Sequence, residues 1–71
     1  MEEITVYKTC FGQVLGTLYY HLREALIDGV YYEIIKLNIY EDKFFGDATI
    51  KLGNEIQYWY FDSKLEIWII E

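Results

Sequence analysis

Ile56–Phe61 reads IQYWYF and Leu65–Ile70 reads LEIWII, and these two runs decide how the chain is expected to fold. Each run is dense in β-branched and aromatic residues and is bounded by turn-forming residues, which predicts a β-strand. A strand with one face in water alternates apolar and polar residues, but both faces of these strands carry large apolar side chains. Because a short chain has little material to cover both faces of a sheet, one aromatic face is expected to remain outside for a partner.

Length and composition set the class of protein. The chain has 71 residues, which predicts a single domain spanning residues 1–71, near the lower size limit for an independent hydrophobic core. Its residues are 54% hydrophobic and 20% aromatic, with no proline. An intrinsically disordered chain is therefore excluded, since disorder requires low hydrophobicity.

The charge is strongly acidic, with 12 Asp and Glu residues against 6 Lys and Arg residues and a formal net charge of −6. This balance disfavours direct nucleic-acid binding, which depends on Lys and Arg, and equally disfavours adsorption to an anionic membrane. A basic protein surface is the electrostatically matched partner. A simpler interpretation stays open, in which the acidity only keeps an aromatic-rich domain soluble.

The segment from Gly12 to Asp28 is predicted to be a helix, because its apolar residues recur at helical spacing. They form one stripe: Leu15, Leu18, Leu22, Ala25 and Leu26. Gly29 is suited to the left-handed residue that follows a helix C-terminus, which places the end of the helix at Asp28. Residues 3–8 form a candidate strand before the helix.

After Gly29 the chain predicts a meander of four strands separated by turn-forming residues. The strands are expected at Val30–Tyr40, Phe44–Leu52, Ile56–Phe61 and Leu65–Ile70. The predicted fold class is therefore α+β: a single helix packed on an antiparallel meander sheet of four strands, or five if residues 3–8 join it, in the order β-α-β-β-β-β.

Turn lengths decide which side chains share a face of this sheet. A two-residue turn at Asp62-Ser63 and a three-residue loop after Leu52 give one uniformly apolar face, expected to be the core beneath the helix. Its members from the last two strands are Ile56, Tyr58, Tyr60, Leu65, Ile67 and Ile69. The opposite face then carries four large apolar side chains: Trp59, Phe61, Trp68 and Ile70. A two-residue Gly53-Asn54 turn would exchange Trp59 and Tyr58 relative to the preceding strand, and it is disfavoured because no face then becomes uniformly apolar.

No group of residues predicts catalysis. Cys10 is the only cysteine and His21 the only histidine, and with a helix between them they would lie about 14 Å apart, too far for a thiol–imidazole pair. Ser63 lies in a predicted turn with no histidine near it in sequence. The protein is therefore expected not to be an enzyme, to use no cofactor and to hold no metal.

The outward aromatic face is the candidate binding site. Its anchors are expected to be Trp59, Phe61, Trp68 and Ile70, since buried aromatic residues dominate interface energies. Four acidic residues are expected to face Lys or Arg on the partner: Asp47, Glu55, Asp62 and Glu66. Two other arrangements stay open, in which the rings are covered within the fold or are buried in a homodimer packed face to face.

In size, acidity and aromatic content, the chain resembles the small acidic inhibitors that phages and mobile elements encode against host nucleases and defence complexes. No individual residue carries this resemblance. It implies a non-catalytic nucleic-acid mimic that occludes a basic, nucleic-acid-binding surface of a larger protein; the alternative is a structural or regulatory homodimer. The acidic start at Met1-Glu2-Glu3 and the lone cysteine predict a cytoplasmic location, which is the host cytoplasm if the protein is phage-encoded.

Overall fold

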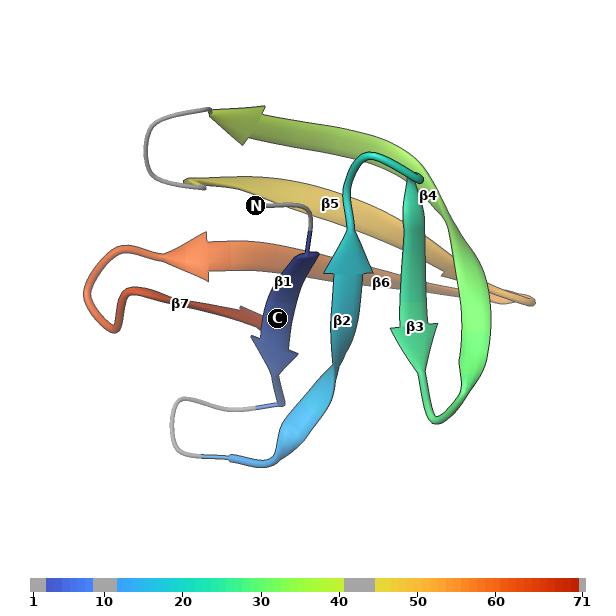
Figure 1. Ribbon diagram of the computed structural model, residues 1–71, viewed down its shortest axis with the longest axis horizontal. Helices are drawn as coiled ribbons and strands as arrows, with labels where there is room; N and C mark the ends of the chain where they lie inside the picture. Colours follow the sequence, from blue (N-terminus) through green and yellow to red (C-terminus); the bar gives the residue numbers. More distant parts are fainter. Residues whose placement is uncertain (1–2, 9–11, 41–44, 71) are drawn as a thin grey trace.

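A computed structural model of the protein describes residues 3–8, 12–40 and 45–70. Within these residues every regular element is a β-strand, and consecutive strands pair side by side until the sheet closes into a barrel (Figure 1). The strands are β1 (Glu3–Tyr7), β2 (Val14–Tyr19), β3 (Glu24–Ile27), β4 (Val30–Tyr40), β5 (Phe45–Leu52), β6 (Glu55–Asp62) and β7 (Ile67–Ile70). The α+β prediction is therefore wrong, and the fold is a small all-β barrel.

The segment predicted as a helix forms β2, a turn and β3 instead. The deciding feature is Asp28-Gly29, where both residues have positive φ, 50° and 79°, and Ile27 pairs directly with Val30. These are the dihedral signs of a two-residue type I′ hairpin, for which Asp-Gly is a favoured sequence. The glycine therefore reverses a strand and does not terminate a helix.

The apolar spacing in this segment also fits a hairpin. Leu18 and Ala25 pair across β2 and β3 and both point into the barrel with no exposed surface, whereas Leu22 lies in the connecting turn and is 66% exposed. Gly16 lies where β2 approaches β3 closely, because a Cβ atom there would be 2.2 Å from the carbonyl oxygen of Leu26. Its small size thus serves strand packing.

The long strand β4 joins two crossing layers of the barrel. Figure 1 shows β1, β2 and β3 running across the direction of β5 and β6, with β4 curving from one set into the other. The pairing of β4 with β5 shifts register between Ile34 and Lys36, which marks a β-bulge. Bulges increase local twist and bend a strand, and orthogonal sheet packing uses such bends as corners.

Strands β1 and β7 close the barrel in parallel. A meander of antiparallel neighbours with an odd number of strands ends in the same direction as it began, so closure between the first and last strands is parallel. Among the described residues this ladder joins Val6 to Trp68 and Tyr7 to Ile69. Whether residues 3–8 join the sheet was left open by the sequence, and the structure places β1 (Glu3–Tyr7) there as a member of the barrel.

The core is the interior of the barrel, and its largest fully buried side chain is that of Trp59. Trp59 pairs across the ladders with Ala48 on one side and Ile70 on the other, so a small residue on β5 leaves room for the indole. Its Nε1–H donates a hydrogen bond to Gln57 Oε1 at 3.1 Å, which satisfies the polar atom of the ring. The remaining buried hydrophobic residues are Ile4, Val6, Leu18, Ala25, Ile27, Ile34, Ala48, Ile50, Trp68 and Ile69.

The register between β5 and β6 differs from the favoured prediction by one residue. Leu52 pairs with Glu55, so the connection is the two-residue Gly53-Asn54 turn, with φ of 64° at the glycine. A positive φ at the first turn residue but not at the second, Asn54, is the mark of a type II′ hairpin. Because a shift of one residue exchanges faces, Trp59 joins Ala48 in the core and Tyr58 faces outward.

The connection between β6 and β7 is longer than predicted. Residues 63–66 form the loop, and Tyr60 pairs with Ile69 where Leu65 was expected. Asp62 Oδ1 accepts hydrogen bonds from the backbone N–H groups of Lys64 and Leu65 at 2.9 and 3.0 Å, and the N–H of Glu66 bonds to the Asp62 carbonyl at 2.7 Å. The register differs from the expected one by four residues, an even number, so Trp59, Phe61, Trp68 and Ile70 still share a face.

Candidate binding surfaces

The four predicted aromatic and aliphatic anchors lie on the inner side of the barrel. Trp59 has no exposed surface, Trp68 is 3% exposed, and Phe61 and Ile70 are partly buried against the core. The expectation that this face points outward is therefore wrong. Closure of the sheet is the physical reason, because a barrel covers one complete face with its own strands.

The four predicted acidic residues do not form a single patch. Asp47 accepts a hydrogen bond from the side-chain amide of Asn38 at 3.0 Å, and Glu55 is exposed at the β5–β6 turn. Asp62 caps the loop of residues 63–66, and Glu66 is exposed within that loop with φ of 59°. Only Asp62 and Glu66 are thus brought together, by the β6–β7 loop.

An apolar face does remain outside, on the strand side opposite Trp59. We call it the outer tyrosine face and define it by Ile56, Tyr58 and Tyr60 of β6. Ile56 is 55% exposed and Tyr58 39% exposed, and the rings of Tyr58 and Tyr60 stack with centroids 5.7 Å apart and planes 19° apart. Its neighbours on β5 are Lys51, Thr49 and Asp47, which pair with Ile56, Tyr58 and Tyr60 in turn. Sequence reasoning assigned these β6 residues to the core, and the alternative Gly53-Asn54 register was the signal that would have placed them outside.

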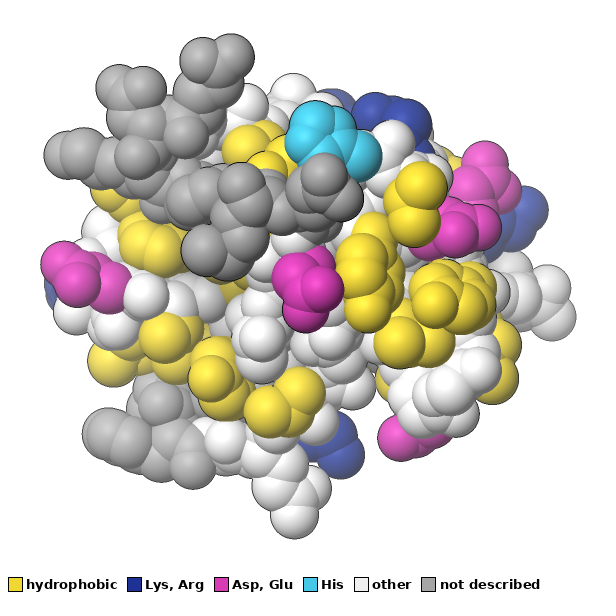
Figure 2. Space-filling view, viewed as in Figure 1, with side chains coloured by type: hydrophobic (Ala, Val, Ile, Leu, Met, Phe, Trp, Pro, Cys, Tyr) yellow, Lys and Arg dark blue, Asp and Glu magenta, His cyan; other side chains and the backbone are white. Residues whose placement is uncertain are grey.

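A second group of exposed apolar side chains lies over β3 and β4, where Figure 2 shows hydrophobic atoms gathered beside acidic ones. Val30 is 49% and Tyr31 56% exposed, and the Tyr31 ring lies 6.2 Å from that of Tyr19. Burial raises the pKa of Tyr19 above its ordinary value of 10.0, and the charges of Glu3 and Tyr31 raise it further. The Tyr19 phenol therefore stays neutral to a higher pH than an ordinary tyrosine.

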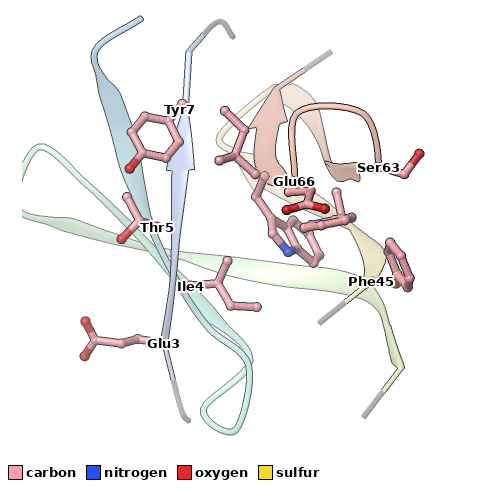
Figure 3. A pocket seen from close by; sticks show the side chains of 10 residues that line it. Glu3, Ile4, Thr5, Tyr7, Phe45, Ser63 and Glu66 are labelled. Carbon is pink, nitrogen blue, oxygen red and sulfur yellow. The ribbon is translucent and has the colours of Figure 1, made fainter. Parts of the chain in front are cut away.

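The barrel also carries a cleft of about 730 Å³ beside the place where β1 and β7 close the sheet. Three of the predicted site residues, Phe61, Glu66 and Trp68, belong to its wall. The other described residues that line it are Glu3, Ile4, Thr5, Tyr7, Phe45, Ser63 and Ile67. In Figure 3 the Ile4 side chain points from β1 toward the side where Glu66 lies, whereas Glu3, Thr5 and Tyr7 project from the other side of β1.

The described residues were also searched for a metal site or a nucleophile with a catalytic partner. His21 is exposed in the β2–β3 turn and lies against the Tyr20 ring, with centroids 4.6 Å apart. No group of three or more His, Cys, Asp or Glu side chains within residues 3–8, 12–40 and 45–70 is placed to hold a metal ion. Cys10 lies outside the described residues. No helix among them is long and apolar enough to cross a membrane.

Comparison of the chain with protein-family models, with curated proteins and with solved structures finds no match. The surfaces described above are therefore interpreted from their own geometry and chemistry.

Proposed function

We propose that the protein is a small, non-catalytic protein-binding module that docks on a larger protein through the outer tyrosine face. The observation that carries this proposal is the exposure of Ile56 and Tyr58 beside the stacked Tyr58–Tyr60 rings, on a strand whose other side contributes Trp59 to the core. Tyrosine is enriched in protein interfaces because it presents a large apolar ring with a hydroxyl at its edge.

The size of the molecule is compatible with such a role. A standard interface covers about 800 Å² on each partner, which is about a sixth of the 4899 Å² surface of this protein. Asp47 and Lys51 border the tyrosines on β5 and would supply polar contacts at the rim.

The net charge of −6 favours a partner with a basic surface. If that surface normally receives nucleic acid, docking of this acidic barrel would occlude it, which is the inhibitory role proposed here. Opposite charges steer the encounter, so the association rate should fall as salt is added. Self-association through the same face is the alternative, and like charges on two copies oppose it.

The test compares capture by three immobilised proteins from an extract of the source cell. The wild type, the double variant Ile56→Ser/Tyr58→Ser and the control Tyr31→Ser are exposed to the same extract, and bound proteins are identified by mass. The proposal expects one protein that is retained by the wild type and the control and is lost with the double variant. Equal retention by all three, with each variant shown to be folded by circular dichroism, would contradict it. Sedimentation of the pure protein tests the homodimer directly, since a dimer that the double variant dissociates would replace the foreign partner.

A further inference from the structure

The cleft beside β1 is an opening in the barrel wall. Within the described residues the β1–β7 ladder joins Val6 to Trp68 and Tyr7 to Ile69, so the first half of β1 has no partner strand from β7. The cleft of about 730 Å³ lies along this unpaired half, between β1 and the loop that carries Ser63 and Glu66. Its volume is within the range of small-molecule sites, about 300–1,000 Å³.

The wall of the cleft combines aromatic rings with a carboxylate. Phe45 and Phe61 meet edge to face, with centroids 4.7 Å apart and planes 78° apart, and Trp68 lies in the same wall. Glu66 is exposed in the loop that borders the cleft, on the side toward which Ile4 points (Figure 3). Of the described residues that line the cleft, none is Lys, Arg or His, and the carboxylate on its side of β1 is that of Glu66, because Glu3 projects from the other side of the strand (Figure 3).

We infer that this cleft binds an organic cation, an ammonium or guanidinium group carried on an apolar stem. Aromatic rings attract such a cation through their negative faces, and a carboxylate at the rim forms a charge-assisted hydrogen bond with it. The apolar part of the wall, with Ile4 and Ile67, accommodates the stem. The overall charge of −6 raises the local concentration of cations and disfavours anionic ligands.

This site is separate from the outer tyrosine face. Phe61 lies on the inner side of β6 and Tyr58 and Tyr60 on its outer side, and the residues that line the cleft do not include Ile56, Tyr58 or Tyr60. The inference therefore holds or fails independently of the proposed protein docking.

The experiment is a titration of the ¹⁵N-labelled full chain with n-butylguanidinium chloride at constant ionic strength, followed by NMR. The neutral analogue n-butylurea, of nearly the same shape, is the matched ligand control. The two indole N–H signals provide an internal control, because Trp68 lines the cleft and Trp59 is enclosed in the core. A saturable shift of the Trp68 signal with the cation, much smaller for Trp59 and for n-butylurea, is expected.

A pair of charge-matched variants tests the role of the carboxylate. Glu66→Gln is expected to weaken cation binding about 1.5-fold to fivefold, the range for an ion pair at an exposed site. Glu55→Gln removes the same charge at the β5–β6 turn, at the other end of β6, and should leave the affinity nearly unchanged. Equal loss in both variants, a shift that does not saturate, or equal response to n-butylurea would overturn the inference.

Two further ligands distinguish the sources of the cation. The blocked tripeptide acetyl-Ala-Arg-Ala-amide presents a guanidinium as a protein side chain, and choline presents a free small-molecule cation. Saturable binding of the peptide assigns the cleft to a Lys or Arg side chain of a protein. Binding of choline and n-butylguanidinium without binding of the peptide assigns it to a free small cation, and absence of all binding overturns the inference.

Discussion

Trp59 and Tyr58 are neighbours on β6 that face opposite sides of the barrel wall, and replacing each by alanine tests the register directly. Aromatic side chains bury about 150–250 Å², so at about 25 cal/mol per Å² burial of an indole contributes about 4–6 kcal/mol. Trp59 has no exposed surface, and Trp→Ala changes at such sites cost about 3–5 kcal/mol. A chain of 71 residues has a total free energy of unfolding of about 4–11 kcal/mol. Trp59→Ala should therefore remove from about a quarter to all of that free energy.

Tyr58→Ala should have a much smaller effect, because the ring is 39% exposed, and loss of its stack on Tyr60 costs about 0.5–1.5 kcal/mol. Trp59→Phe supplies an intermediate that remains measurable. It keeps an aromatic ring but loses the hydrogen bond to Gln57 and part of the ring, which together contribute about 1–3 kcal/mol.

The assay is urea unfolding followed by far-ultraviolet circular dichroism, with the free energy of unfolding extrapolated to water. The expected order of stability is wild type, Tyr58→Ala, Trp59→Phe and Trp59→Ala. Similar losses for Tyr58→Ala and Trp59→Ala, or a loss below about 1 kcal/mol for Trp59→Ala, would refute the assigned register, because a ring on an outer face does not contribute a core-sized free energy.

Three further predictions concern other parts of the barrel. Gly46→Ala should destabilise the protein by about 1–3 kcal/mol, because the added Cβ atom would lie 1.8 Å from the Asn38 carbonyl oxygen. A thermal melt unchanged from that of the wild type would contradict this close approach. Asp62→Ala should lower the melting temperature by about 4–8 °C, because two backbone N–H groups of the β6–β7 loop lose their acceptor at a net loss of about 1 kcal/mol, and Asp62→Asn should recover part of it. The raised pKa of Tyr19 favours its neutral form in the folded state, so its contribution to stability is complete below pH 10.0 and is lost as the pH rises through the pKa of the folded protein. Glu3→Gln should make that alkaline loss smaller, as measured by urea midpoints across the pH range, and an unchanged loss would exclude the influence of Glu3.

The strands from Val30 onward were predictable because their β-branched and aromatic runs are separated by clear turn residues. The segment from Gly12 to Asp28 was not, since its leucines recur at helical spacing, whereas in the hairpin Leu22 lies in the turn and Leu18 and Leu26 face opposite sides. Local chemistry favoured the hairpin, however. Gly16, Thr17, Tyr19 and Tyr20 are poor helix formers, and Asp28-Gly29 between apolar residues is a strong hairpin signal. Giving that dipeptide precedence over the leucine stripe would have led to the observed β2–β3 hairpin.

The orientation of the aromatic residues failed for a different reason, which lies in long-range structure. The sequence of β6 and β7 places Trp59, Phe61, Trp68 and Ile70 on one face whichever turn precedes them, and the structure bears this out. Which face becomes the interior depends on pairing with β5 and on the parallel contact of β7 with β1, and neither is encoded within the hairpin itself. A flat sheet under a helix needs one uniformly apolar face. The interior of a closed barrel can instead combine small and large side chains on adjacent strands, as it does where Ala48 pairs with Trp59. β6 carries large apolar side chains on both of its faces, so in either register one of these faces lies outside the core. Closure of the barrel thus changes which residues are left outside, from the tryptophans to Ile56, Tyr58 and Tyr60, while an exposed apolar face remains.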